Sequence, residues 1–354
     1  MTVVSRRTFL LSSAALVASA YVPAPSAQGR KSLTVVSWGG PYQRAQSQAV
    51  WRPAAKALGI ELVEETYNGL ADLRLRVRSN SVNWDVVSIG AGGAARASAE
   101  KLLEPLDYDV IDVSTFFPGY HGEHWVAGDL YSTALAWNTE VYKNAAPASW
   151  ADFWDVERFP GHRAYRNQAL GHLEPALMAD GVAPQDVYTT LSTDEGLKRA
   201  IDKVARLKQH IAAFWGSGAQ QAQLLNDGAV DMASAWTGQI APLMKAGRPI
   251  AMTYAQGMLD ADCYVVPLGA PHRELAMAFL NEASKAQYQA AFSMAMPYGA
   301  ANEAAYGDGL IPAEVAATLP SSPENLAKQL RLDAEWWRDN QARAEKLYQE
   351  MISR

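Results

Sequence analysis

Two acidic residues, Asp260 and Asp262, stand directly before an apolar run in the stretch DADCYVVPLGAP. The letters YVVP are typical of a short β-strand that is covered on both faces. A carboxylate at the edge of such a strand loses hydration, and this loss costs free energy unless a hydrogen-bond donor or a cation compensates for it. A single aspartate there is more often a turn residue. Two that bracket one alanine predict that at least one of them meets a ligand.

Two tryptophans stand at strand ends elsewhere in the chain. In SWGGPY a strand ends on Trp38, and Tyr42 begins a helix. Gly39 and Gly40 between them allow backbone conformations that other residues rarely adopt. In SAWTG a strand ends on Trp236 before another helix. The alternative interpretation of these segments is a tight turn and ordinary core packing. Because open α/β sheets bind their ligands where strands end, we expect these residues to meet at a binding site.

The residue types in these three segments predict a box for an ammonium group. An aromatic ring attracts a cation with ~0.5–2 kcal/mol. A carboxylate adds charge-assisted hydrogen bonds, which are stronger than those between neutral groups.

The first third of the chain alternates strand and helix patterns. Short β-branched runs and amphipathic stretches follow one another as βαβαβα. This order predicts an open, mostly parallel sheet. The expected strands are 33–38, 59–67 and 84–90, and the expected helices are 42–58, 70–79 and a stretch that ends at Leu102.

A second α/β unit follows a long strand expected over 131–142. Ser149 opens a helix, and Ser192 with Glu195 predicts a capping box for a helix that runs to Ile211. A chain of 354 residues is long enough for two cores. The other expected elements are helices at 169–180, 237–247, 272–285, 287–295 and 333–353, and strands at 231–236 and 262–267.

Residues 1–27 have the pattern of an export signal. Arg6 and Arg7 precede a mildly apolar segment that is too short to span a bilayer. SRRTFLL resembles the twin-arginine signal, although Leu11 stands where that pattern has a lysine. The general secretory route is the alternative. Both routes predict a location outside the cytoplasm.

The composition excludes some classes of function. Loss of residues 1–27, which hold two arginines and no acid, changes the formal net charge from −6 to −8, with 29 basic against 37 acidic residues. Such an acidic protein is a poor nucleic-acid binder. Cys263, as the only cysteine, excludes an internal disulfide and is expected to be a buried inert thiol.

The chain resembles the periplasmic solute-binding proteins of ABC importers, in the spermidine/putrescine branch. The resemblance rests on SWGGPY, SAWTG, DADCYVVP, MPYG and PENL…DAEWWRDN in this order. It implies an α/β fold of type II, with two lobes that are each a mixed sheet flanked by helices and that close by a hinge. The implied lobes are residues 30–135 with 262–306, and 136–261 with 307–354.

The resemblance also implies roles for single residues. The family's aromatic residues fall on Trp38 and Tyr42 in the first lobe, on Trp236 in the second, and on Tyr298. Its hinge aspartate falls on Asp262, beside Asp260. We therefore expect a ligand-binding set of Trp38, Gly39, Gly40, Tyr42, Trp236, Asp260, Asp262, Tyr298 and Arg338.

Two departures from the family bear on the solute. Arg338 stands where a polyamine binder more usually has an uncharged amide, and the family's acid beside the first tryptophan is missing. Fewer acids and a nearby arginine favour a smaller or zwitterionic amine such as γ-aminobutyrate. Arg166 and Arg338 are the candidates for binding its carboxylate. A putrescine-like diamine stays open at this point.

The resemblance further implies partners. These are an inner-membrane ABC permease and, during export, the twin-arginine translocase. The protein is expected to be a monomer, and neither an enzyme nor a holder of a metal or cofactor.

Other motifs support alternatives of a different class. IGAGGAA, residues 89–95, fits a dinucleotide-binding fingerprint and would suit an exported nicotinamide oxidoreductase, but no strand that ends in an acid follows at the usual distance. Ser88 and Ala91 beside it are weak candidates for solute contacts. HGEH, residues 121–124, lacks a third metal ligand. Trp336 and Trp337 are expected to be core residues.

Overall fold

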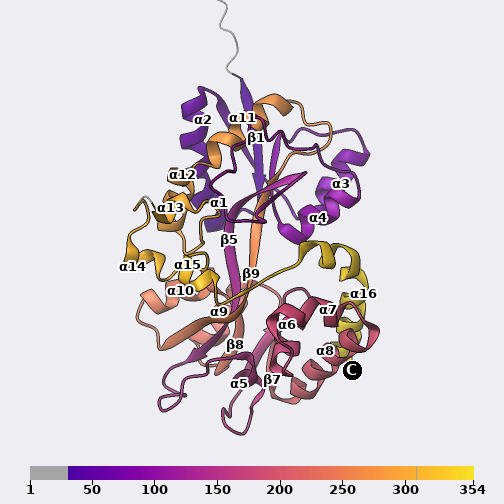
Figure 1. The fold of residues 1–354 in the computed structure, drawn as a ribbon, viewed down its shortest axis with the longest axis vertical. Coiled ribbons are helices and arrows are strands. Elements are labelled where there is room, and N and C mark those ends of the chain that lie inside the picture. The colour runs from indigo at the N-terminus through magenta and orange to yellow at the C-terminus, as the bar shows by residue number, and fades with distance from the viewer. Residues whose placement is uncertain (1–30, 308) are drawn as a thin grey trace, which may run out of the picture.

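Two α/β lobes joined by two long strands make up the protein (Figure 1). This computed structural model describes residues 31–307 and 309–354, so the expected leader, residues 1–27, lies outside the described residues. Strands β5 (Trp125–Asn138) and β9 (Ile250–Val265) pair in antiparallel fashion and run through both lobes. The two-lobed α/β architecture predicted from the sequence is confirmed.

Within the described part of the chain, the strands form one mixed sheet of ten strands. Their order is β2 (Glu61–Thr66), β1 (Ser32–Ser37), β3 (Val86–Gly90), β9, β5, β8 (Met232–Trp236), β6 (Arg163–Arg166) and β7 (Ile211–Trp215), with β4 (His121–Gly122) beside β5 and β10 (Leu330–Arg331) beside β9. In the N-terminal lobe, β1 pairs in parallel with β2 and β3. In the C-terminal lobe, β6 pairs in parallel with β7 and β8. β9 pairs in antiparallel fashion with β3 of the first group, and β5 pairs in antiparallel fashion with β8 of the second. The two lobes therefore share their central strands.

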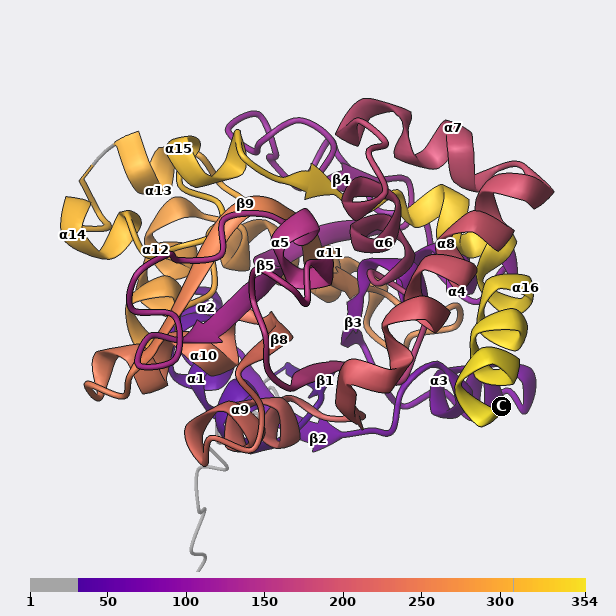
Figure 2. The same ribbon diagram turned by 90° about the horizontal axis from the view of Figure 1, so that it is seen from below.

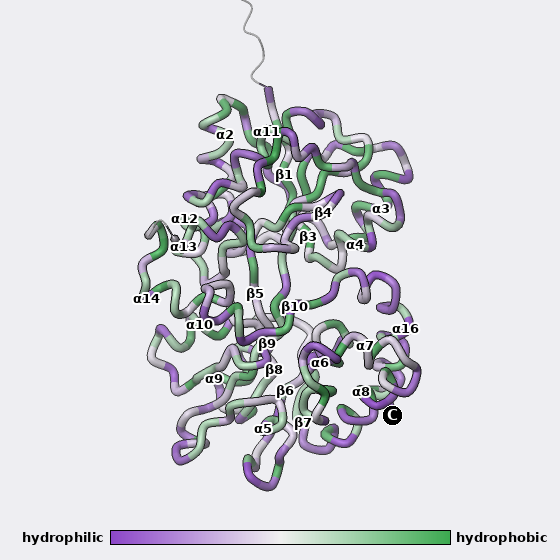
Figure 3. The backbone as a smooth tube through the Cα atoms, in the orientation of Figure 1, coloured by the Kyte–Doolittle hydropathy of each residue, from purple (hydrophilic) through white to green (hydrophobic). Residues whose placement is uncertain are grey.

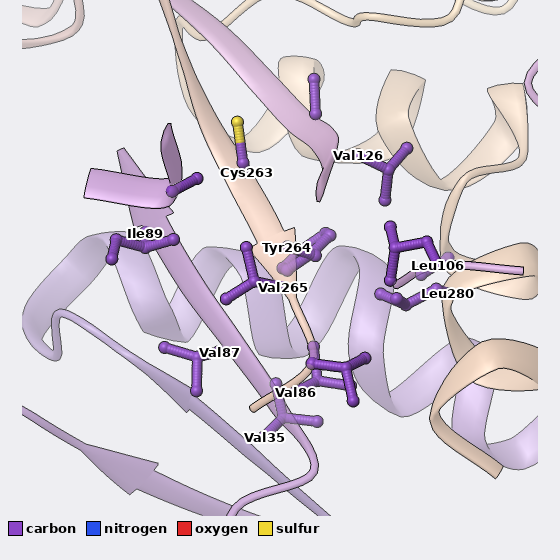
Figure 4. Packing of buried hydrophobic residues seen from close by; sticks show 14 of the residues in the cluster. Val35, Val86, Val87, Ile89, Leu106, Val126, Cys263, Tyr264, Val265 and Leu280 are labelled. Carbon is purple, nitrogen blue, oxygen red and sulfur yellow. The ribbon is translucent and has the colours of Figure 1, made fainter. Parts of the chain in front are cut away.

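The N-terminal lobe forms because apolar strand residues are covered by helices. Gly59 ends α2 in the left-handed conformation, with φ of 65°. Figure 4 shows Val35, Val87 and Val265 of neighbouring strands packed together in its core. The elements of this lobe are β1 (Ser32–Ser37), α1 (Gly40–Gln46), a π-helical turn (Ser47–Trp51), α2 (Arg52–Leu58), β2 (Glu61–Thr66), α3 (Leu70–Arg78), β3 (Val86–Gly90), α4 (Ala91–Ala99), β4 (His121–Gly122), α11 (Arg273–Ala283) and α12 (Ala286–Ala295).

The C-terminal lobe has its own apolar core, which includes the buried Trp337 and Tyr348 of the last helix. Figure 2 shows that helix, α16, beside α8 and close to α4 of the other lobe. The elements of this lobe are α5 (Trp150–Trp154), β6 (Arg163–Arg166), α6 (Leu173–Ala179), a 3₁₀ turn (Pro184–Asp186), α7 (Val187–Leu191), α8 (Asp194–Leu207), a second 3₁₀ turn (Lys208–His210), β7 (Ile211–Trp215), α9 (Gly218–Asn226), β8 (Met232–Trp236), α10 (Thr237–Lys245) and α16 (Ala334–Ser353).

A segment of short helices after α12 packs against the N-terminal lobe. Ile311 and Leu319 form a small buried cluster with Ala290 of α12. Residues 307–354 are expected from the sequence to belong to the C-terminal lobe, but this packing leads us to propose that residues 311–319 belong to the N-terminal lobe instead. The elements of this segment are α13 (Ala304–Gly307), α14 (Ala313–Ala316), α15 (Pro323–Leu326) and β10 (Leu330–Arg331).

The strand that carries the two acids is longer than predicted. β9 begins at Ile250, twelve residues before the expected start, so Asp260 and Asp262 lie inside the strand. Its register with β5 jumps between Thr253 and Met258, and Gln256 there has φ of +58°. This irregular stretch contains polar residues and a glycine, which hid the strand pattern in the sequence.

Of the two helix N-terminal caps predicted from the sequence, one is confirmed and one is wrong by one residue. Ser149 caps α5 in a capping box with Asp152, as its sequence suggests. The box predicted at Ser192 is wrong by one residue, because the Thr193 hydroxyl accepts the hydrogen bond from Gly196 N and α8 starts at Asp194. Both residue types can cap a helix, so only the backbone path decides between them.

Apolar residues follow the central strands, and hydrophilic ones follow outer loops and much of α16 (Figure 3). Trp336, Trp337 and Cys263 are buried, as predicted. Among the described residues, no helix is long and apolar enough to cross a membrane.

Candidate functional site

A cavity of about 730 Å³ lies between the two lobes, at the point where β5 and β9 pass from one to the other. Seven of the residues expected from the sequence line it together. They come from the N-terminal lobe, the paired central strands and the C-terminal lobe: Trp38, Tyr42, Tyr298, Asp260, Asp262, Trp236 and Arg166.

The Asp262 carboxyl group lies on β9 between β3 and β5, where it pairs in register with Gly90 and Asp129. Its Oδ1 accepts a hydrogen bond of 3.3 Å from the indole Nε1 of Trp38. Burial, and next the charge of Asp260, raise the pKa of Asp262 to about 7, although donors from Trp38 and Tyr42 act in the opposite direction. A cation at this point would therefore replace missing solvation.

Asp260 lies two residues earlier on the same face of β9. Its Oδ2 accepts a hydrogen bond of 2.8 Å from the Tyr131 hydroxyl, and its Oδ1 one of 2.8 Å from the Ala261 backbone N–H. Burial raises the pKa of Asp260, whereas these two donors and the positive charge of Arg166 lower it. The two acids thus line the cavity side by side at the junction of the lobes.

Aromatic rings line the cavity around the two acids. Trp38 is 44% exposed and lines the cavity, and its ring also packs against the Tyr67 ring with centroids 4.9 Å apart. The Tyr42 and Tyr298 ring centroids are 5.2 Å apart, and the Tyr131 ring meets the ring of Trp236 edge-on at 6.5 Å. The walls are therefore π-surfaces that suit a cation or an aliphatic chain.

The Arg166 guanidinium group supplies a positive charge from the other lobe. It lies over the Trp236 ring at 4.9 Å and donates to the Gln168 side chain at 2.8 Å and to the Leu170 carbonyl at 3.3 Å. Burial lowers the pKa of Arg166, and the nearby Tyr131 and Asp260 raise it. The cavity is therefore lined by acids of β9 and by an arginine of β6, and Arg96 of α4 lines it as well.

Arg338 is not part of this cavity. It lies on α16, forms an ion pair of 2.7 Å with the neighbouring Asp339, and borders a separate hollow. The expectation that it faces the solute is therefore corrected: β6, rather than the last helix, presents an arginine to the cavity. Gln341, one helical turn further along α16, lines the cavity instead.

The glycines after β1 shape the turn without lining the cavity. Gly39 and Gly40 both have positive φ, 78° and 64°, and the Gly39 N–H donates to the Gln43 side chain at 2.9 Å. They let the chain turn so that Trp38 and Tyr42, on either side, reach the cavity.

The glycine motif after β3 borders the cavity through Gly90, Gly92 and Gly93. The weaker candidates beside it do not. The Ser88 side chain is buried and accepts a hydrogen bond of 3.3 Å from Gln46, and Ala91 lines the separate hollow.

The histidines of HGEH lie beside that same hollow. His124 meets the Ser98 hydroxyl at 3.0 Å. In the part of the chain that the structure describes, no group of three or more His, Cys, Asp or Glu side chains could hold a metal ion.

Three residues beside the expected ones were not predicted from the sequence: Tyr131 and Arg96, which line the cavity, and Asp129, which lies opposite Asp262 on β5. Asp129 is 1% exposed and its Oδ2 accepts a hydrogen bond of 2.6 Å from the Tyr42 hydroxyl. A signal was present, because the acid stands inside the apolar stretch WVAGDLYSTALAW, just as Asp260 and Asp262 stand beside one.

Comparisons with known proteins place the chain in a family. A family model described as bacterial extracellular solute-binding protein matches residues 53–318. A γ-aminobutyric acid-binding protein of Pseudomonas aeruginosa is 38% identical over 323 residues, which cover 91% of this chain and 90% of that protein.

Two solved structures are similar over almost their whole length. The PBP MotA from A. tumefaciens B6, in complex with glucopine, is 40% identical with a TM-score of 0.83, and the match covers 91% of this chain and 99% of that one. An ABC transporter substrate-binding protein from Bradyrhizobium japonicum is 39% identical with a TM-score of 0.86 at the same coverage.

Proposed function

The chain belongs to the bacterial extracellular solute-binding protein family and is the substrate-binding component of an ABC importer; from this premise we propose that its solute is a small amine that also carries a carboxylate, of the γ-aminobutyrate kind. One observation carries this proposal. Asp260 and Asp262 line the same cavity as Arg166. A zwitterion places opposite charges at its two ends and matches both kinds of charge.

Each end of such a solute finds a partner of opposite charge. The ammonium group binds between Asp262 and the rings of Trp38 and Tyr42, where it restores the solvation that burial removes. The carboxylate binds the Arg166 guanidinium, whose planar donors suit it.

Capture couples these contacts to closure of the lobes. Trp38 and Tyr42 belong to the N-terminal lobe, whereas Trp236 and Arg166 belong to the C-terminal lobe. A solute held by both sides stabilises the closed form, in which water is excluded and the charge pairs strengthen. No bond is broken in this cycle.

The relatives support the same class of solute. One of them is named for γ-aminobutyric acid, and another was solved with glucopine. A diamine such as putrescine is a second candidate, because Asp260 and Asp262 both line the cavity and Asp129 lies opposite Asp262 on the neighbouring strand.

Residues 1–27 complete the proposed cycle. We propose that they direct the protein out of the cytoplasm by the twin-arginine route, on the strength of Arg6 and Arg7 before an apolar segment. In the periplasm, the protein would act as a monomer that delivers its solute to an inner-membrane permease. A fusion of residues 1–30 to a reporter, with Arg6 and Arg7 both changed to Lys, tests the route, since loss of export is expected.

A thermal-shift panel tests the solute. γ-Aminobutyrate, putrescine, spermidine, simple amino acids and NAD are added to the mature protein, and the melting temperature is measured. γ-Aminobutyrate is expected to give a large concentration-dependent rise, because a ligand that binds only the folded state stabilises it. A response to NAD alone, or to simple amino acids but to no ω-amino acid or diamine, would contradict the proposal.

A further inference from the structure

Strand β5 contains one inserted residue at Gly128. The register of β5 with β9 shifts there by one position, so that Asp129 lies opposite Asp262. Without the insertion, position 128 would face Asp262 and Asp129 would point to the other side of the sheet. Glycine is required at the insertion because a Cβ atom on Gly128 would lie 2.7 Å from the Tyr264 ring. The bulge therefore brings a second carboxyl group to the side of Asp262.

The Asp129 carboxyl group lacks a partner of opposite charge. Its Oδ2 accepts the Tyr42 hydrogen bond, but its Oδ1 is buried without any hydrogen-bond partner. Across the described residues, no ion pair within 4.0 Å includes Asp129. The titratable groups that face it from the packed elements are Tyr42 on α1, Tyr298 after α12, and Asp262, Cys263 and Tyr264 on β9.

Asp129 and Asp262 face each other in a buried place, so ionisation of both carboxyl groups costs free energy. Burial comes first and the charge of Asp262 second in raising the pKa of Asp129 well above its ordinary range. An uncharged carboxylic acid removes both costs. A proton on the unpartnered Oδ1 also makes this oxygen a hydrogen-bond donor, so it is no longer a buried acceptor that lacks a donor.

Resting on the proposed function, we propose that Asp129 is a specificity-determining residue: it holds a proton in the empty protein and releases it only when a solute brings a second ammonium group. With the acid neutral, the amine side of the cavity presents the charge of Asp262, which one ammonium balances. A diamine adds a further positive charge, the Asp129 O–H bond breaks, and the proton passes to solvent. Because this deprotonation costs free energy at neutral pH, the protonated acid selects zwitterions over diamines.

Infrared spectroscopy tests the proton without any solute. At about pH 8.5, the pKa values of about 7 for Asp262 and Glu174 leave both of these acids ionised. The wild-type spectrum is expected to keep the C=O stretching band of a protonated carboxyl group, and Asp129→Asn is expected to lose it. Asp85→Asn is the matched control. Asp85 is equally buried, but it accepts hydrogen bonds from the backbone N–H groups of Thr34 and His272, so the band is expected to stay.

Calorimetry tests the link to the solute. Binding of γ-aminobutyrate and of putrescine is measured at the same pH in two buffers with different heats of ionisation, which counts the protons released. Putrescine is expected to release about one proton more than γ-aminobutyrate from the wild type. In Asp129→Asn this difference is expected to vanish.

Different outcomes overturn the two proposals. A missing infrared band, or one that persists in Asp129→Asn, refutes the protonated acid. Equal proton release with both solutes, or putrescine binding as tightly as γ-aminobutyrate at this pH, refutes its role in selection. If neither solute binds, the proposed function fails, and the infrared result still decides the state of Asp129. Should Asp129→Asn fail to fold, Tyr42→Phe replaces it, because loss of the Tyr42 donor is expected to shift the same band.

Discussion

Replacement of Asp262 by Asn is expected to weaken solute binding and to stabilise the empty protein. Asn keeps the size of the side chain and an oxygen that can accept from Trp38 Nε1, now 3.3 Å away. It removes the charge that faces the ammonium group. A charge-assisted hydrogen bond contributes roughly 1.5–3 kcal/mol, which corresponds to a loss of affinity of about tenfold to about a hundredfold.

The gain in stability follows from the raised pKa of Asp262. The folded protein holds the proton up to about pH 7, whereas the unfolded chain releases it near the ordinary value of 3.8. Stability is therefore lost as the pH rises from the lower value to the higher one. At ~1.4 kcal/mol per pH unit, the loss at neutral pH is on the order of 4 kcal/mol. Asn carries no such cost, so the melting temperature of the empty variant is expected to rise by several degrees.

Two measurements decide this prediction. Calorimetric titration with γ-aminobutyrate gives the affinity, and thermal unfolding without solute gives the melting temperature, both at neutral pH. Glu174→Gln is the matched control. Burial also raises the pKa of Glu174 to about 7, but this residue lies in the C-terminal lobe outside the cavity, so its variant should gain stability and keep its affinity. An unchanged affinity in Asp262→Asn, or a loss of affinity together with a lower melting temperature, would refute the reasoning.

Four further predictions concern the same cavity. Trp236→Ala is expected to weaken binding at least tenfold in calorimetry, whereas Arg338→Ala is expected to leave it unchanged; equal effects would contradict the placement of the site. Arg166→Ala should weaken γ-aminobutyrate binding at least tenfold more than putrescine binding, and an equal loss would argue against a carboxylate at that residue. Affinity for an ammonium solute should rise with pH up to about pH 7 and then level off, because the solute favours the ionised form of Asp262; a flat profile from pH 5 to 7 would refute it. Gly128→Ala should lower the melting temperature through the clash with the Tyr264 ring, and an unchanged melting temperature would show that the bulge tolerates a side chain.

The sequence determined the class of the protein and predicted seven of the residues that line the cavity. Strand ends that stop on Trp38 and Trp236, and acids at Asp260 and Asp262, are local features, and an open α/β sheet gathers strand ends at one edge. The alternation of apolar and polar residues predicted most helices to within a few residues, because local periodicity is visible without any long-range contact.

Only the tertiary structure decided which charges face one another. Arg166 and Arg338 look alike in the sequence, but β6 turns the first toward the cavity and α16 pairs the second with Asp339. Asp129 reaches Asp262 because one inserted residue on β5 changes the register with a strand more than a hundred positions away. Such a pairing depends on how two distant strands align, and the residue types near either one do not contain that information.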